Sequence, residues 1–479
     1  MTGMTDRSFD QLLYQGAAQL PPQTVGQDPP DPWRKALWRV CWGLALTTIT
    51  LNFLDLQYIL PALGSVLLYL GFRALRRENG WLRMGYGLSA LFLLLRGVIT
   101  ILNATPLVST SSGWGYVLGM AVWLCNLLLA IALWQGLKEV FRKAGQKPKT
   151  GAAGGTVLCY LFLFLLALVS AQGLLLWPIV LLWIGLLIGL FRVSRSLDQA
   201  GYAISPAPVR FSEQRVILVW LGLLLAAVLA CLFLFRRYPV EASPAQVETG
   251  QEELRQKLLV LGFPEEVLSD LTDGEVALLE GAQTVDAESF ASRPELPDEI
   301  EQLSMRFVQV ELPQDRVRYF LWFSWEEAPD HRLQEGLEIQ PNGQNALTMN
   351  YDMLPSGRLL WEEEGQLYQA PISGTYEGHT QNSIFFGPST YNSFAFHFSL
   401  PARGERIRGY VSYEAYDAYS GWHIFNAIAN YVHQESWLVY PWETPLQHQW
   451  RNWNNTDEVF PARQFLTMFT LNKDDMETE

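Results

Sequence analysis

The chain has 479 residues, and its net charge of −14 is divided very unevenly along the sequence. Residues 1–237 carry 20 Lys/Arg and 9 Asp/Glu, a net charge of +11, whereas residues 238–479 carry 14 and 39, a net charge of −25. All four Cys lie in the first part, so the second cannot form an internal disulfide, and its negative charge argues against a nucleic-acid partner.

A proline-containing tail, residues 1–35, precedes the first apolar run. It has neither the short basic start of a signal peptide nor an Ala-x-Ala cleavage site before that run. We therefore predict an extended tail followed by a retained membrane span.

The region 36–237 contains seven apolar runs of the length that an α-helix needs to cross a bilayer, roughly 20 residues. These runs lie at 36–54, 58–76, 82–102, 114–137, 154–172, 174–192 and 215–235. The pattern predicts a transmembrane bundle of seven helices.

Basic residues gather in alternate connections between these runs, and such connections favour the cytoplasm. The basic connections are 73–83, 138–149 and 192–215, and those between them are nearly uncharged. We therefore expect a cytoplasmic N-terminus and an extracytoplasmic C-terminal domain in a bacterial plasma membrane, with Arg236 and Arg237 against lipid headgroups.

Arg96 is the charged side chain that lies deepest in an apolar run, and a charge in a span usually has a partner or reaches the interface. We predict that it pairs with Asp55 at the outer end of the first run. Extension to the interface and a role in binding a transported substrate are the alternatives.

Two Gly-x-x-x-Gly patterns allow close approach of helices. Gly115 and Gly119 form one, and Gly185 and Gly189 form the other. Packing within the bundle is the simpler interpretation and dimerisation the alternative, so the oligomeric state is open.

Residues 238–302 are predicted to be a linker and a small helical segment. Thr249-x-x-Glu252 and Thr272-x-x-Glu275 both fit the capping box that begins a helix. Gly262 is expected to end the first helix and Pro264 to open the next.

From 303 onward the apolar period changes to two, which predicts strands separated by Gly, Pro and Asn turns. We expect an antiparallel β-sandwich over 303–460, jelly-roll-like in topology, and an acidic tail over 461–479. The predicted strands are 304–312, 317–326, 335–340, 357–363, 366–372, 382–387, 393–400, 406–416, 422–434 and 436–440.

Aromatic side chains are dense in this β region, and an exposed row of Tyr and Trp could stack on sugar rings. The alternative is that they fill the core. The candidate binding residues are Trp361, Tyr410, Tyr416, Tyr419, Trp422 and Trp437.

Motifs for catalysis and metal binding are missing from the sequence, including His-Glu-x-x-His, Gly-x-Ser-x-Gly and paired Cys at metal spacing. The nearest approach to a metal pair is His433-x-Glu435. We predict no cofactor, no metal and no enzymatic activity, although folding could bring together a carboxylate pair that no motif reveals.

These features predict a multi-pass bacterial membrane protein in the lipid bilayer that displays an extracytoplasmic sensing or ligand-binding β domain. The ligand is expected to be a wall polymer, glycan, peptide or partner protein. An accessory or permease-like part of a transporter is one alternative, which the scarcity of intramembrane charge disfavours. An anti-sigma-type signalling protein is the other.

Overall fold

The computed structural model describes most of the chain, and the described part is divided into two compact units. The described residues are 32–48, 56–109, 112–168, 176–199, 204–205, 208–290, 300, 302–314, 316–342, 347–349, 355–383, 387–417, 423–451 and 458–471. One unit covers 1–100 and 113–222, and the other covers 101–112 and 223–479.

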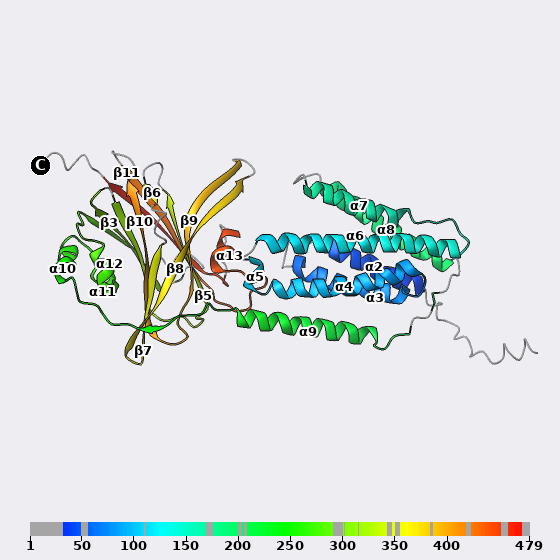
Figure 1. Ribbon diagram of the computed structural model, residues 1–479, viewed down its shortest axis with the longest axis horizontal. Helices are drawn as coiled ribbons and strands as arrows, with labels where there is room; N and C mark the ends of the chain where they lie inside the picture. Colours follow the sequence, from blue (N-terminus) through cyan, green and yellow to red (C-terminus); the bar gives the residue numbers. More distant parts are fainter. Residues whose placement is uncertain are drawn as a thin grey trace, which may run out of the picture. The chain divides into compact units, whose positions relative to one another are not determined.

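The first unit is helical (Figure 1). Its long helices are α2 (Pro32–Thr48), α3 (Leu56–Leu75), α4 (Gly80–Leu102), α6 (Ser112–Lys143), α7 (Gly151–Leu168), α8 (Leu176–Gln199) and the start of α9 (Glu213–Leu234). Five of the described helices, α3, α4, α6, α8 and α9, are long and apolar enough to cross a membrane, and α7 contains a shorter apolar helix. An apolar helical region is therefore confirmed, whereas seven spans remain a prediction.

Close contact between α2 and α3 depends on two glycines. A Cβ atom at Gly64 would lie 2.9 Å from the carbonyl oxygen of Gly43, so a larger residue would push the helices apart. The same unit contains an ion pair between Arg39 on α2 and Glu213 at the start of α9.

Between α9 and the main strands, the second unit contains three short helices, α10 (Glu252–Val260), α11 (Glu265–Asp270) and α12 (Asp273–Ala277). Thr272 and Glu275 form the predicted capping box of α12. The predicted box at Thr249 is wrong, because α10 begins after Gln251, which has a left-handed backbone and makes no side-chain cap. Gly262 ends α10 as predicted, with φ +102°.

In the described part of the chain, the β domain is formed from twelve antiparallel strands. They are β1 (Ser243–Pro244), β2 (Val285–Phe290), β3 (Leu303–Leu312), β4 (Arg316–Trp325), β5 (Gln334–Asn342), β6 (Leu347–Met349), β7 (Ser356–Glu363), β8 (Gln366–Ser383), β9 (Gly387–Ser399), β10 (Glu405–Asp417), β11 (His423–His433) and β12 (Ala462–Leu471). The order is β12-β11-β5-β9-β8-β7-β10-β4-β3-β2, with β1 beside β8 and β6 beside β10.

The long strand β8 belongs to both layers of this curled sheet. Its first part pairs with β7 up to Ser373, and its second part pairs with β9 from Gly374. A Cβ atom at Gly374 would lie 2.6 Å from the ring of Phe396, so glycine is needed where the strand changes layer. The predicted antiparallel β domain is confirmed, and its jelly-roll detail remains a prediction.

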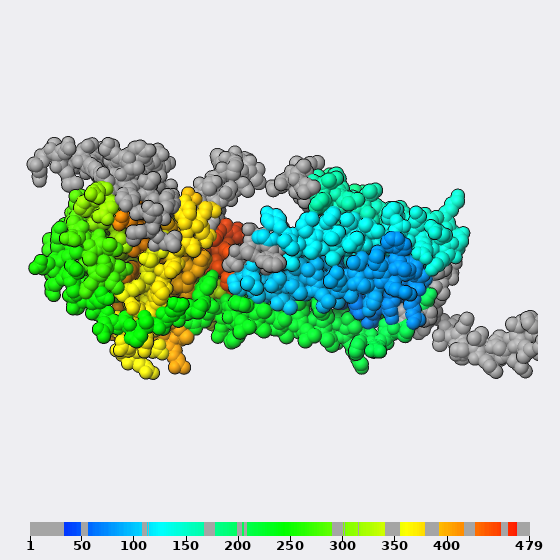
Figure 2. Space-filling view, viewed as in Figure 1, coloured from blue at the N-terminus to red at the C-terminus, as the bar shows by residue number. Residues whose placement is uncertain are grey.

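The two layers enclose an apolar core that includes Phe307, Phe323, Leu337, Phe396 and Tyr431. The outer face of β3, β4 and β10 is covered by α10–α12, which appear in green at one end of the β domain (Figures 1 and 2). The outer face of β5, β9 and β11 is covered around α13 (Pro445–Arg451).

Two predicted segments differ from the structure. Residues 436–440 are not a strand, because Trp437 and Tyr440 instead contact an apolar cluster with the end of α9. Residues 462–471, predicted as part of an acidic tail, form β12 and pair along β11.

Candidate functional site

A buried carboxylate and a buried imidazole face each other at one end of the β-domain core. Glu335 on β5 and His433 on β11 are directly opposed in the antiparallel register. Nδ1 of His433 lies 2.7 Å from Oε1 of Glu335, and both side chains are fully buried. Glu335 lies two residues before Leu337, and His433 lies two residues after Tyr431. Because alternate residues of a strand face the same side and Leu337 and Tyr431 belong to the core, Glu335 and His433 also point inward.

Aromatic side chains enclose this pair. The rings of Trp325 and His433 meet edge to face at 5.1 Å. Nε1 of Trp325 donates to the Tyr431 hydroxyl over 3.3 Å. Within the described residues, Oε2 of Glu335 and Nε2 of His433 have no hydrogen-bond partner, and Nε2 lies 3.5 Å from Oε1 of Glu435.

Burial raises the pKa of the Glu335 carboxyl above its ordinary value, and the nearby His433 offsets this only in part. For His433, burial lowers the pKa, but the charges of Glu335 and Glu435 outweigh burial and the net direction is upward. Because the two groups are in contact and each affects the pKa of the other, they titrate as a coupled pair.

An open cavity of about 500 Å³ lies beside this pair. Trp325 and Glu435, both of which touch His433, also line the cavity, and Oε1 of Glu435 is 3.5 Å from Nε2 of His433. The complete lining is Ile300, Gln302, Trp325, Glu327, Ala328, Pro329, Asp330, His331, Glu435 and Pro461.

The cavity lining is acidic. Glu327, Asp330 and Glu435 contribute three carboxylates, and no Lys or Arg is among the described lining residues. In the part of the chain that the structure describes, Glu327 and Asp330 have no ion-pair partner. Carboxylates left without counter-charges at a partly enclosed surface create a negative potential that attracts a cation.

The residue before Glu335 connects this site to the end of α9. Nε2 of Gln334 donates to the carbonyl oxygen of Phe235 over 2.9 Å. Trp442 donates from Nε1 to the same oxygen, also over 2.9 Å. The backbone N–H of Gln434, next to His433, donates to the carbonyl of Gln334 over 3.1 Å. The residues that follow His433 and precede Glu335 are therefore joined to each other and, through Gln334, to Phe235.

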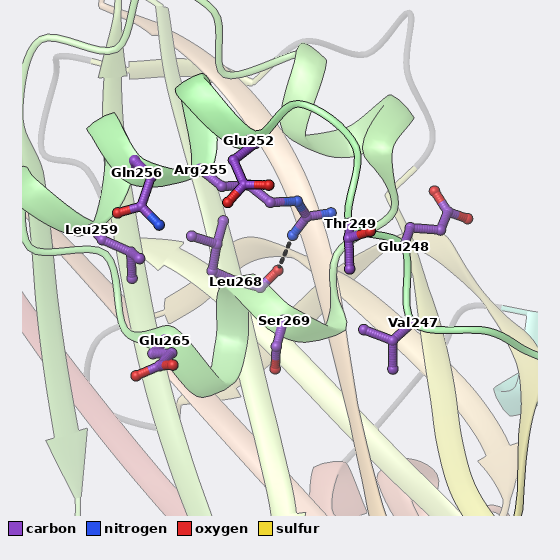
Figure 3. Close-up of a pocket in the computed structure, with 10 residues that line it drawn as sticks. All are labelled: Val247, Glu248, Thr249, Glu252, Arg255, Gln256, Leu259, Glu265, Leu268 and Ser269. Carbon is purple, nitrogen blue, oxygen red and sulfur yellow. Dashed lines mark hydrogen bonds between the residues drawn. The ribbon is translucent and has the colours of Figure 1, made fainter.

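A second cavity, of about 250 Å³, lies on α10 and α11 (Figure 3). The guanidinium of Arg255 in this cavity is hydrogen-bonded to neighbouring residues of the same helical segment. Its Nη1 donates to the Leu268 carbonyl over 2.7 Å, and its Nη2 donates to the Leu271 carbonyl and to Asp273, each over 3.0 Å. Because this charge ties the small helices together, we do not place a ligand there.

The predicted aromatic platform is not assembled by the residues whose side chains are described. Trp361 is 2% exposed and Tyr410 is 0% exposed, so both belong to the interior. Trp437 is half-buried and meets Phe233 edge to face at 6.0 Å. Tyr419, Trp422 and the side chain of Tyr416 lie outside the described residues.

The predicted ion pair in the membrane region cannot be placed, because Asp55 lies outside the described residues. Arg96 is partly buried, with its guanidinium 5.2 Å from the centre of the Phe92 ring. Its Nη2 donates to the Thr47 carbonyl over 3.4 Å.

The predicted glycine contacts fall into two groups. A Cβ atom at Gly189 would lie 2.7 Å from Cβ of Ala152, so this glycine permits close packing of α8 on α7. Gly115, Gly119 and Gly185 have open space where a Cβ atom would stand.

No group of three or more His, Cys, Asp or Glu side chains is arranged to hold a metal among the described residues. Glu435 of the pattern His433-x-Glu435 lines the acidic cavity instead, and His433 contacts Glu335, which is not among the residues predicted for the site. The alternation of side chains along each strand could have indicated this pair, because Glu335 and His433 lie at positions that face the core.

No protein-family model and no curated protein matches this chain. Solved structures with partial similarity include a pore forming protein, the Clostridium perfringens delta-toxin and the Clostridium perfringens NetB toxin in its membrane inserted form. Each is 7–8% identical, and the match covers 40% of this chain and 90–97% of the other, with a TM-score of 0.15. At that TM-score the similarity supports no argument about fold or function.

Proposed function

We propose that this chain is a sensor of the bacterial plasma membrane, with seven membrane-crossing helices, a cytoplasmic N-terminus and an extracytoplasmic β domain. Support for this arrangement comes from the apolar helices and from the alternation of basic and uncharged connections. The transporter alternative has less support, because the spans contain few charged side chains.

The proposed ligand is a cationic group, such as the amine of a peptide or of a peptide-bearing wall polymer. The observation that carries this proposal is the cavity of about 500 Å³ with three carboxylates, no described Lys or Arg, and the buried Glu335–His433 pair behind it. A stacked glycan has less support, because Trp361 and Tyr410 are interior residues.

A bound cation would act on the pair through Glu435. Glu435 lies in the cavity wall and 3.5 Å from Nε2 of His433, so a cation at this carboxylate weakens its attraction for a charged imidazole. The pKa of His433 then decreases, because Glu435 no longer raises it to the same extent. Because Gln334 and Gln434 flank the pair and Gln334 binds the Phe235 carbonyl, a rearrangement there reaches the end of α9.

The test is calorimetric titration of the full chain in lipid nanodiscs with pentalysine, comparing wild type with the variant Asp330→Asn/Glu435→Gln. Hydrogen bonds between charged groups contribute about 1.5–3 kcal/mol, so we expect the dissociation constant to rise by about tenfold or more.

The matched control is Glu252→Gln/Glu265→Gln, which also removes two negative charges, but from the cavity in Figure 3. This control should bind pentalysine as wild type does. Equal affinity of all three proteins, or equal loss in both variants, would mean that pentalysine responds only to overall charge and would overturn the proposal.

A further inference from the structure

Four arginines gather where α9 joins the β domain, although the region after residue 237 is strongly acidic. Arg237 donates to the Leu400 carbonyl, and Arg332 donates to the Pro401 carbonyl over 3.4 Å. Arg237 and Arg403 line one cavity, and Arg236 lies over the Phe233 ring at 3.9 Å.

These four guanidinium groups lack carboxylate partners among the described residues, unlike Arg255, Arg406 and Arg408. Glu363 lines the cavity of Arg237 and Arg403, but within the described ranges no ion pair joins it to either arginine. Burial lowers the pKa of Arg237, and the charges of Arg236 and Arg332 lower it further, as expected for cations held close together. An uncompensated cluster of this kind is suited to anionic oxygen atoms from another molecule.

An apolar loop, residues 436–442, lies next to the same end of α9. Trp442 is buried with Leu232 of α9 and Ala104, and Trp437 and Tyr440 pack on this cluster. Leu438 is 56% exposed and therefore projects from the loop. Trp and Tyr at a helix end are typical of the boundary between lipid and water.

The position of this loop along α9 follows from the helix residues that pack against it. α9 is the most apolar of the candidate spans, and only 11% of its apolar window is buried inside the structure. The cluster around Trp442 includes contact with Val228, six residues before the last residue of α9, which at 1.5 Å per residue is about 9 Å along the helix. If α9 crosses the bilayer, the loop must lie at the depth of the lipid interface.

We propose that the loop 436–442 and Arg236, Arg237, Arg332 and Arg403 form a lipid-contacting surface on the β domain. The apolar loop enters the outer interface, and the arginines bind phosphate groups of anionic lipids. The proposal requires α9 to span the membrane but does not depend on a ligand in the acidic cavity.

The experiment measures depth at position 438 in the full chain. A nitroxide is attached at Leu438→Cys after the four native Cys are replaced, and the protein is placed in nanodiscs of phosphatidylcholine with or without phosphatidylglycerol. Relaxation by oxygen, by a soluble nickel complex and by a nickel-chelating lipid is compared. The control is Leu278→Cys, a leucine with 46% exposure just after α12.

We expect the label at 438 to be relaxed by oxygen and by the nickel-chelating lipid, and the label at 278 to be relaxed by the soluble complex. A label at 438 that behaves like the one at 278 would overturn the proposal. Phosphatidylglycerol should draw the 438 label deeper, and Arg332→Gln/Arg403→Gln should abolish that difference. A difference that persists in the double variant would contradict the role of these arginines.

Discussion

Gln334 donates from Nε2 to the carbonyl oxygen of Phe235 over 2.9 Å, which ties β5 to the residue immediately after α9. The next residue along β5, Glu335, forms the buried pair with His433. The group that would respond to a ligand is therefore adjacent in sequence to the group that holds the helix end. This proximity is the physical basis of the proposed sensing function.

The stability of the β domain should decrease as pH rises. Both Glu335 and His433 have pKa values raised in the folded protein, so each binds its proton more tightly when folded. Their stabilising contribution is complete below the unfolded pKa values, 4.5 and 6.5, and is lost as pH rises through the folded values. Thermal unfolding of wild type should show a Tm that falls as pH rises above the ordinary pKa of the glutamate, 4.5.

The variant Glu335→Gln/His433→Gln isolates this contribution, because it removes both titrating groups and keeps polar side chains. Its Tm should vary less with pH than that of wild type. His331→Gln, which changes an exposed histidine of the cavity, is the control and should keep the wild-type slope. Parallel slopes for wild type and the double variant would show that the pair does not control the pH dependence.

Asp270 should be the most sensitive residue in the attachment of α10–α12 to the sheet. Its carboxylate is 3% exposed and accepts from Nε of Arg408 over 2.9 Å and from Nε1 of Trp322 over 2.9 Å. Asp270→Ala leaves a partly buried arginine unpaired, and breaking a buried pair costs about 3–5 kcal/mol. Hydrogen exchange of residues 252–277 should become much faster, whereas Trp322→Phe should produce a smaller effect.

Two threonines offer a matched test of helix capping. Thr272 accepts from the Glu275 N–H over 3.1 Å, and Glu275 accepts from the Thr272 N–H over 2.9 Å. Thr272→Ala should reduce the free energy of unfolding by about 1 kcal/mol. Thr249→Ala should have little effect, because α10 begins at Glu252 after an uncapped Gln251. Equal losses in chemical denaturation would contradict this assignment of caps.

The proposed membrane topology predicts which side of the membrane exposes Leu278. A membrane-impermeant maleimide should label Leu278→Cys in intact spheroplasts, in a protein whose native Cys are replaced. A cysteine introduced at Lys147, in a basic connection, should be labelled only after lysis. The reverse pattern would place the β domain in the cytoplasm.

The sequence predicted the parts of the fold that depend on local patterns. The strands β3 and β10 largely alternate apolar and polar residues, β4 contains a continuous apolar run between clear turns, and Thr272 has the local signature of a cap. By contrast, the strand predicted over 366–372 covers only the first part of β8, because Gly374, Gly378 and polar neighbours interrupt the apolar pattern beyond it. The pairing of those residues with β9 maintains the strand despite that local interruption.

The candidate site was predicted less well, because it depends on contacts between distant segments. His433 and Glu435 were noticed as a local pattern, but the partner Glu335 lies 98 residues away in sequence. Only the pairing of β5 with β11 brings it opposite His433. Similarly, residues 436–440 have the composition of a strand, and tertiary contacts with α9 determine their different conformation.

The most direct test of the sensing function is hydrogen exchange of residues 228–238 in nanodiscs, with and without saturating pentalysine. Binding should change exchange at this end of α9 in wild type. In Gln334→Ala, which lacks the bond to Phe235, pentalysine should still bind, but the change in exchange should be lost. An unchanged exchange pattern in wild type with the cavity occupied would contradict the account, because the ligand would then bind without reaching the membrane helix.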